Sequence, residues 1–219
     1  MASTIDEARR RLAGARLYVV SADAPPALQA DVLCQAIDGG AEVVQLRNKA
    51  AAPGDLLDAA RRVAEHAHAH DAVFIVNDVP ELADTSGADG VHVGQDGGPT
   101  AAIRLRLPPG SLVGRSTHSL AQAQAAAAGG ADYLGVGPVW ETPTKPGRRA
   151  VGTDLLGAVA AAVAIPWFAI GGINGTNLAE VLDAGARRVA VVRAVAVAPD
   201  AAAATRALLA RLAAIEVLV

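Results

Sequence analysis

Short runs of β-branched and aliphatic residues alternate with alanine-rich stretches along almost the whole 219-residue chain. Eight runs are expected to form strands: Leu17–Val20, Val43–Leu46, Val73–Val76, Gly90–Val93, Leu112–Gly114, Tyr133–Val136, Trp167–Ile170 and Arg188–Val192. The stretches that follow them are expected to form helices, at about 27–38, 54–69, 80–86, 99–106, 119–129, 153–163, 176–184 and 199–212. Strands that alternate with helices indicate βαβ units and a parallel sheet.

Eight strand–helix units in a chain of 219 residues are typical of a closed (β/α)8 barrel. We therefore expect an α/β fold with a single TIM-barrel domain over residues 1–219, in which residues 1–14 form an N-terminal extension. An open, doubly wound sheet is the alternative. Hydrophobic residues make up 52% of the chain and aromatic residues only 3%, so Val, Leu, Ile and Ala must build the core. That composition suits parallel strands buried on both faces.

Bulk properties argue against several classes of partner. The net charge of -3 gives no reason to expect binding to nucleic acid or to a membrane. The first residues are polar and charged, and no apolar run approaches the ~20 residues of a membrane span. The single cysteine, Cys34, rules out an internal disulfide and is expected to be an inert core thiol. We expect a soluble cytoplasmic protein.

Two recurring features are expected to carry no chemistry. Gly-Ala followed by an acidic residue precedes several strands, as in 87–89 and 130–132, where glycine would end a helix and alanine would pack a tight turn. This element is expected to be scaffold at the bottom of the barrel. Of His66, His68 and His70, only the first and last share a helix face. All three are expected to be solvated, without a metal.

In a (β/α)8 barrel the active site lies at the carboxyl ends of the strands. Gln45, Arg47 and Lys49 end the second predicted strand at a spacing of two, which places their side chains on one side of an extended segment. Two cations beside an amide would form an anion cradle, because Arg offers a fork for phosphate oxygens and Lys a point charge. The alternative is a solvated strand end.

Asn77 and Asp78 directly follow the third predicted strand. A carboxylate that faces a phosphate cradle suits Mg²⁺, which prefers one or two carboxylates plus phosphate oxygens and water. The alternative is that one of the two residues caps the helix that begins near Pro80.

Two further strand ends suit a phosphate group. The loop after the sixth strand contains Thr142, Thr144 and Lys145, whose hydroxyls and ammonium favour phosphate contacts, although a proline-rich surface turn is the alternative. Gly171-Gly172 precedes a helix expected to begin near Thr176, and a helix N-terminus supplies N–H donors.

Seven segments occur in order, each at a strand end: VVQLRNK, FIVND, GADGVHVGQD, VGRSTHS, GADYLGVGPVWETPTKPG, WFAIGGIN and AGARRVAVVRAV. Together, over about residues 15 to 212, they closely resemble the thiamine phosphate synthase (thiamine-phosphate pyrophosphorylase) family. The resemblance implies a transferase. It would join 4-amino-5-hydroxymethyl-2-methylpyrimidine diphosphate to hydroxyethylthiazole phosphate, or to its carboxylated form, and release pyrophosphate.

The resemblance also implies roles for individual residues. Departure of pyrophosphate is regarded as largely dissociative in the family, so cations and Mg²⁺ would stabilise the leaving group. Arg47, Lys49, Ser116 and Lys145 are the implied catalytic residues. The implied substrate-binding residues are Gln45, Leu46, Arg47, Asn48, Lys49, Asn77, Ser116, His118, Thr142, Thr144, Lys145, Gly171, Gly172, Val192 and Arg193. The implied magnesium ligands are Asp78 and Asp96.

The chain departs from the family pattern at two positions. Asn48 stands where the family usually has an acidic residue, although that position need not face the site. Gly97 stands where the family usually has its second acidic magnesium ligand, and Asp96 lies one residue earlier. We therefore predict weaker Mg²⁺ binding than in a relative with both acids.

Two other functions fit parts of the same pattern. A thiazole tautomerase of the same fold would use a histidine near His118 as its acid and base, and would tolerate Gly97. A non-catalytic barrel that binds thiamine precursors would also tolerate loss of an acidic ligand. The complete loop from Thr142 to Lys145 favours the synthase. The family often forms homo-oligomers, and the alanine-rich helical exterior permits one here.

Overall fold

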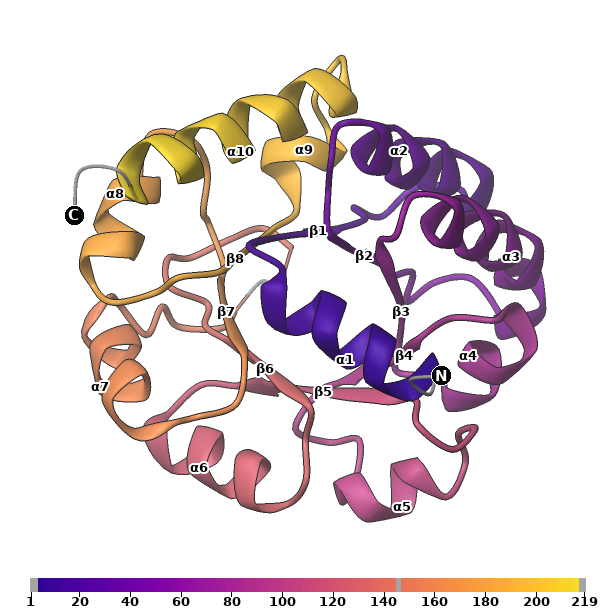
Figure 1. Cartoon of the computed structure of the whole chain (residues 1–219), viewed down its shortest axis with the longest axis horizontal. Helices are drawn as coiled ribbons and strands as arrows, with labels where there is room; N and C mark the ends of the chain where they lie inside the picture. The colour runs from indigo at the N-terminus through magenta and orange to yellow at the C-terminus, as the bar shows by residue number, and fades with distance from the viewer. Residues whose placement is uncertain (1–3, 145–146, 217–219) are drawn as a thin grey trace.

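The computed structural model describes residues 4–144 and 147–216, and it confirms the expected closed barrel of parallel strands ringed by helices (Figure 1). Each strand pairs in parallel with the next along the chain, and the last pairs with the first to close the barrel. The strands are β1 (Leu17–Val20), β2 (Val43–Leu46), β3 (Val73–Asn77), β4 (Gly90–Val93), β5 (Leu112–Thr117), β6 (Tyr133–Val136), β7 (Trp167–Ile170) and β8 (Val189–Val191).

One helix, α1, precedes β1, and the other helices follow the strands and cover the outside of the barrel (Figure 1). They are α1 (Thr4–Gly14), α2 (Pro26–Asp38), α3 (Pro53–Ala69), α4 (Pro80–Ser86), α5 (Thr100–Arg104), α6 (Leu120–Ala128), α7 (Asp154–Ala162), α8 (Leu178–Asp183), α9 (Arg193–Ala196) and α10 (Ala201–Glu216). In the part of the chain that the structure describes, no helix combines the length and apolar character needed to cross a membrane.

The structure differs from the sequence-based expectation at a few element boundaries. β5 continues to Thr117 instead of ending at Gly114, because its polar end still pairs with β6. The seventh βα loop is longer than expected, so α8 begins at Leu178 and not near Thr176. α1 and α9 were not expected as helices at all.

The strands alternate between two apolar layers. In β1, Leu17 and Val19 pack outward with the helices, whereas Tyr18 and Val20 face the barrel interior. The other strands follow the same alternation, which the period of two along a strand requires. Because residues on both faces of the strands are buried, most strands are continuous apolar runs instead of alternating apolar and polar residues.

α1 lies across the end of the barrel where the strands begin, and Figure 1 shows it in front of the centre of the ring. Leu12 of α1, which is 1% exposed, packs in the same apolar cluster as Val43 and Val73 at the starts of β2 and β3. Arg9 and Arg11 anchor the helix to acidic residues that precede β6 and β4. α1 therefore closes the barrel opposite its open mouth.

Acidic residues at this closed end bind the backbone of the preceding strand. Asp89 accepts the N–H of Phe74 at 2.8 Å, and Asp132 accepts that of Val113 at 2.8 Å. Glu42 binds the N–H of Leu17 in the same way, at 2.9 Å. These bonds satisfy strand ends that have no earlier ladder partner. They confirm that the repeated Gly-Ala-acid element is scaffold.

Candidate active site

A cavity of about 320 Å³ opens at the carboxyl ends of the strands. It gathers most of the residues that the sequence assigned to a site, although they come from six different strand ends. Those that line it are Gln45, Arg47, Lys49, Asn77, Asp78, Ser116, His118, Thr142, Thr144, Gly171, Gly172, Val192 and Arg193.

The remaining predicted residues lie elsewhere. Leu46 alternates away from the cavity and packs in the outer apolar layer. Asn48 donates to the carbonyl of Ala24 and accepts from the N–H groups of residues 50 and 51, so its side chain shapes the second βα loop. Asp96 is exposed and is absent from the described cavity wall. Lys145 lies outside the described residues.

Arg47 and Lys49 form the cationic side of the cavity. Arg47 is only 7% exposed, and its Nη1 lies 3.3 Å from Oδ1 of Asp23. Ser21 fixes the backbone of Arg47, because its Oγ accepts the Arg47 N–H at 2.9 Å. Lys49 is more exposed and places its Nζ 3.8 Å from a carboxylate oxygen of Asp78. A buried, positioned guanidinium beside an exposed ammonium suits a polyanion better than a single charge.

Asp78 sits at the cavity rim in a left-handed conformation, with φ of +62°. Aspartate tolerates this region better than most residues. One carboxylate oxygen accepts from Nδ2 of Asn77 at 2.7 Å, and the other accepts from the N–H of Gly94 at 3.4 Å. The carboxylate remains partly exposed beside Lys49. The carboxylate oxygens of Asp78 are hard ligands of the kind that Mg²⁺ prefers, and they fit this ion when substrate phosphate oxygens and water supply the other ligands.

The loop that carries Asp96 is tied to β5. Gln95 donates through Nε2 to the carbonyl of Ser116, and Arg115 donates through Nη1 to the carbonyl of Gly98 at 2.7 Å. A Cβ on Gly97 would lie 3.0 Å from the Cβ of Val93, closer than ordinary packing allows. The loop therefore has a conformation adapted to glycine at position 97.

A chain of hydrogen bonds crosses the floor of the cavity. The Tyr18 hydroxyl lies 3.1 Å from that of Tyr133 and donates to Oε1 of Gln45 at 3.2 Å. The Tyr133 hydroxyl lies 3.2 Å from Nδ1 of His92, whose Nε2 lies 3.0 Å from Oγ of Ser116. The two predicted substrate residues, Gln45 and Ser116, are therefore oriented by one shared network.

Both tyrosines in this network are completely enclosed. Burial, above all, raises the pKa of each phenol, so both stay protonated at neutral pH. Tyr133 fits because β5 has a glycine beside it: a Cβ on Gly114 would lie 2.1 Å from the Tyr133 ring. The chain has only two tyrosines, and it places both inside the barrel.

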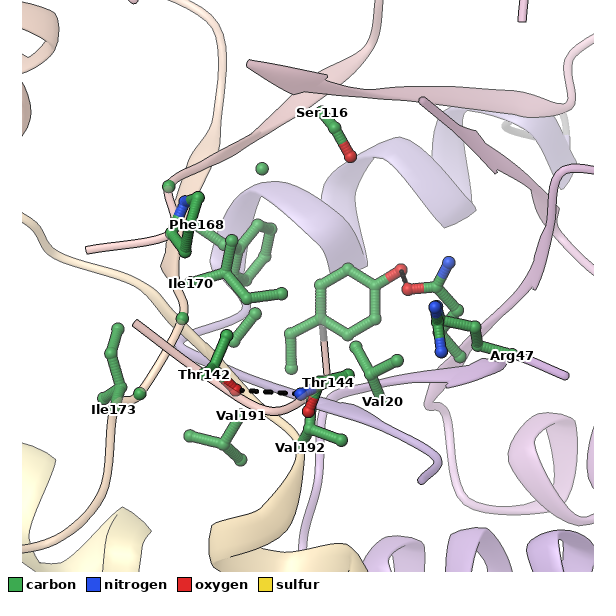
Figure 2. Close-up of a pocket in the computed structure, with 18 of the residues that line it drawn as sticks. Val20, Arg47, Ser116, Thr142, Thr144, Phe168, Ile170, Ile173, Val191 and Val192 are labelled. Carbon is green, nitrogen blue, oxygen red and sulfur yellow. Dashed lines mark hydrogen bonds between the residues drawn. The ribbon is translucent and has the colours of Figure 1, made fainter. Parts of the chain in front are cut away.

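The opposite side of the cavity is built on glycine and hydroxyl groups. Gly171 and Gly172 have φ of +107° and +72°, and a Cβ on Gly171 would collide with Pro138 at 2.4 Å. The Thr144 N–H donates to Oγ1 of Thr142 at 3.3 Å, the dashed line in Figure 2. Backbone and hydroxyl donors on this side suit a phosphate monoester.

The helix expected at this phosphate side is present but begins slightly later, and a second, short helix also borders the cavity. α8 begins six residues after Gly172, so its N-terminus does not follow the glycines directly. Instead the carbonyl of Gly172 accepts from Nδ2 of Asn177 at 3.0 Å, which holds the intervening loop. The short helix α9 begins at Arg193, beside the cavity. Short extra helices after the eighth strand recur as phosphate sites in this fold.

His118 also borders the cavity, and its ring is held by the backbone. Nδ1 lies against the carbonyl of Gly137, and because a carbonyl only accepts, Nδ1 carries the proton. The His118 N–H donates to Oε1 of Gln122 at 2.8 Å. The contact with Gly137 orients the ring, and the bond from the backbone N–H to Gln122 holds the backbone of His118 beyond the end of β5.

Several apolar residues of the cavity wall were not predicted from the sequence. Phe168, Ile170 and Ile173 lie on one side of the cavity and Arg47 on the other (Figure 2). His92, which belongs to the network on the cavity floor, was assigned no role from the sequence. To find these residues from the sequence, one would need to know which side chains of each strand point into the barrel. That depends on the register of the strands, which the sequence does not show.

A closed parallel barrel with cations, hydroxyls and a carboxylate at its mouth defines a class: a TIM-barrel enzyme that acts on anionic small molecules. The family model for thiamine monophosphate synthase matches residues 17–195. The chain therefore belongs to the thiamine monophosphate synthase family.

Individual relatives agree with this assignment. A thiamine-phosphate synthase from Gloeobacter violaceus is 47% identical over 198 residues, which cover 90% of this chain but only 58% of that relative. One from Mycolicibacterium gilvum is 46% identical, with 94% of this chain and 91% of the relative covered. The structure of a thiamine phosphate pyrophosphorylase from Pyrococcus furiosus superposes with a TM-score of 0.85 at 33% identity, covering 94% of this chain and 98% of that one.

Proposed function

We propose that this chain is a transferase that makes thiamine phosphate. It would condense 4-amino-5-hydroxymethyl-2-methylpyrimidine diphosphate with hydroxyethylthiazole phosphate and release pyrophosphate. If the thiazole phosphate is the carboxylated form, its carboxylate would also leave, as CO2. One observation carries the proposal: a single cavity holds a cationic side at Arg47 and Lys49 and a separate glycine–hydroxyl side at Thr142, Thr144 and Gly172. Two phosphorylated substrates that react with each other need two such anion sites in one cavity.

The cationic side suits the diphosphate. As the bond between the methylene carbon and the diphosphate oxygen breaks, both bonding electrons leave with the diphosphate. Its negative charge grows, so Arg47 and Lys49 bind the leaving group more tightly in the transition state than in the ground state. Lys145, from the loop after β6, would add a third cation.

The floor suits the pyrimidine ring. Gln45 and Ser116 offer an amide and a hydroxyl that the buried network holds in place, and Asn77 accepts from Nε2 of Gln45 at 3.0 Å. Fixed donors and acceptors orient the ring without reorganisation during the reaction. The pyrimidine ring electrons would stabilise the positive charge that develops on the methylene carbon.

The opposite side suits the thiazole phosphate. Thr142, Thr144, Gly172 and Arg193 would bind its phosphate, and the ring nitrogen would donate its lone pair to the methylene carbon. That step forms the new C–N bond and leaves a positively charged thiazolium. Phe168 and Ile170 would exclude water, which would otherwise capture the same carbon.

Asp78 is the residue that we propose to hold Mg²⁺, together with oxygens of the substrate diphosphate. The ion, when bound, would neutralise charge on the departing pyrophosphate. Asp96 could contribute only if its loop left the bonds that Gln95 and Arg115 make. The protein itself would therefore supply few carboxylate ligands to the ion.

A coupled assay tests this function. The purified chain receives both phosphorylated substrates with Mg²⁺, and pyrophosphate and thiamine phosphate are measured together. We expect equal amounts of the two products, and none when either substrate is left out. Absence of pyrophosphate release, with isomerisation of the thiazole carboxylate instead, would indicate the tautomerase that His118 would serve.

A further inference from the structure

A histidine–aspartate cluster lies at the closed end of the barrel, away from the cavity. Asp38 ends α2, whereas His66 and His70 lie one turn apart at the end of α3. Their ligand atoms, one from each residue, all lie within 4.8 Å of one another. Because α2 and α3 run opposite to the strands and pack side by side, their last turns meet near the starts of β2 and β3 (Figure 1).

The two imidazoles are arranged as metal-binding histidines commonly are. Nδ1 of His70 lies 2.8 Å from the carbonyl of His66, so it must donate its proton there. In the neutral ring this leaves Nε2 as a lone pair, 3.9 Å from Oδ1 of Asp38. A backbone carbonyl that fixes the tautomer is the usual outer contact of a metal-bound histidine.

His66 completes the arrangement from the same helix face. Its Nε2 lies 2.7 Å from the same Oδ1 of Asp38, and its ring stacks on that of His70 with centroids 4.4 Å apart. Two imidazole nitrogens thus converge on one carboxylate oxygen. A cation could replace the proton between His66 and Asp38 and accept the His70 lone pair as well.

The surroundings suit an ion that enters from water. The side chains of Asp38, His66 and His70 are 50%, 30% and 45% exposed. The nearby Arg62 is paired with Asp31 at 2.7 Å, so its charge is offset. Burial, above all, raises the pKa of the neighbouring Cys34 thiol, so it stays protonated and is a poor ligand.

We propose that Asp38, His66 and His70 bind one divalent transition-metal ion such as Zn²⁺, which would brace α2 against α3. Imidazole nitrogens with one carboxylate favour zinc, copper or nickel over Mg²⁺, which prefers oxygen ligands. Since the site is at the closed end of the barrel, the ion would stabilise the fold without entering the reaction. The proposal does not depend on which substrates the cavity binds.

Calorimetric titration of Zn²⁺ into the metal-free, untagged full chain at pH 7.5 tests the proposal. We expect one equivalent to bind, and His70→Gln to weaken that binding by about tenfold or more, as expected when one of three ligands is lost. Asp38→Asn should weaken it as well. The matched control is His68→Gln, which alters a neighbouring histidine that faces Asp89 at 3.4 Å and should leave the affinity unchanged.

Two further readouts separate this site from the cavity. Cu²⁺ bound to the wild-type chain should show coupling to two imidazole nitrogens by electron paramagnetic resonance, and His70→Gln should lose one. Zn²⁺ should raise the melting temperature of the wild-type chain but not of His70→Gln, while pyrophosphate release by that folded variant stays at the wild-type rate. Equal zinc affinities for wild type, His70→Gln and Asp38→Asn would overturn the proposal.

Discussion

At the scale of single residues, the candidate site depends on a few side chains whose positions are fixed by backbone contacts. Asp78 reaches the rim through a left-handed backbone, and Arg47 is held through Ser21. By contrast, Asp96 is exposed in a loop that two hydrogen bonds tie to β5. The two carboxylates that the family resemblance implies as magnesium ligands, Asp78 and Asp96, are therefore not equivalent.

We predict that Asp78→Asn lowers kcat on the order of a hundredfold, as loss of one transition-state electrostatic contact does, and raises the Mg²⁺ concentration for half-maximal activity. Asp96→Asn is the matched control and should change either quantity less than threefold, because its carboxylate does not line the described cavity. Magnesium titrations of pyrophosphate release measure both. An equally severe loss in Asp96→Asn would show that the loop moves to bring Asp96 to the ion.

Tyr133→Phe tests the buried network. The change removes a hydroxyl that contacts both Tyr18 and His92, so two hydrogen bonds of the buried network are lost. We expect the free energy of unfolding to fall by about 1–3 kcal/mol, and KM for the pyrimidine diphosphate to rise because Ser116 loses its support.

Thr205→Val provides the control for that variant. Thr205 is fully buried and its hydroxyl donates to the carbonyl of Ala201 at 2.8 Å, far along the chain from the cavity residues. The Thr205→Val variant should be less stable than the wild type, without a change in KM for the pyrimidine diphosphate. If Tyr133→Phe also leaves KM unchanged, the network serves folding alone and does not position the substrate.

At the scale of elements, α1 does more than extend the chain, because it closes the end of the barrel where the strands begin. Leu12→Ala should lower the free energy of unfolding by about 2–5 kcal/mol, the usual cost of a cavity in a core. Denaturant titration measures the change, with Arg10→Ala as the exposed control on the same helix. A loss below about 0.5 kcal/mol would mean that α1 contributes little.

His68 of α3 is a titratable residue that contacts Asp89, just before the start of β4. A hydrogen bond that His68 donates to Asp89, above all, raises the pKa of His68, against the opposing effects of burial and of Arg11. A raised pKa in the folded state stabilises the fold below the unfolded pKa of about 6.5, and the effect disappears as pH rises through the folded value.

The stability difference between wild type and His68→Gln should therefore be greatest at acidic pH and shrink toward alkaline pH. Denaturant titrations at several pH values between about 5.5 and 8.5 measure it. A difference that grew as pH rises would contradict the assignment of His68 as the protonated partner of Asp89.

Most elements, and most of the polar residues that line the cavity, could be predicted from sequence because β-branched runs and polar strand ends are local signals. α1 and α9 could not, since one is a polar, arginine-rich segment and the other a single turn. The Asp38–His66–His70 cluster was not predicted, for a different reason. The histidine spacing was visible within one helix, but the carboxylate comes from its neighbour, and only helix packing brings it near.

At the scale of the whole molecule, the barrel has two ends with different tasks. The closed end holds α1, the acidic residues that bind strand N–H groups and the proposed zinc site. The open end holds a cavity whose two sides come from strands far apart in sequence, β2 and β3 against β6 to β8. Separating stability from chemistry in this way lets each end change independently.

The central claim is that one cavity holds two anions on separate sides, and steady-state kinetics with crossed variants test it most directly. Arg47→Ala should raise KM for the pyrimidine diphosphate by about tenfold or more and lower kcat, because a charged contact is worth more than about 1.4 kcal/mol. In the same variant, KM for the thiazole phosphate should stay near its wild-type value. Thr144→Val should show the reverse pattern, with only KM for the thiazole phosphate raised. Arg47→Ala raising KM for the thiazole phosphate alone, or both variants affecting both substrates equally, would contradict the division of the cavity.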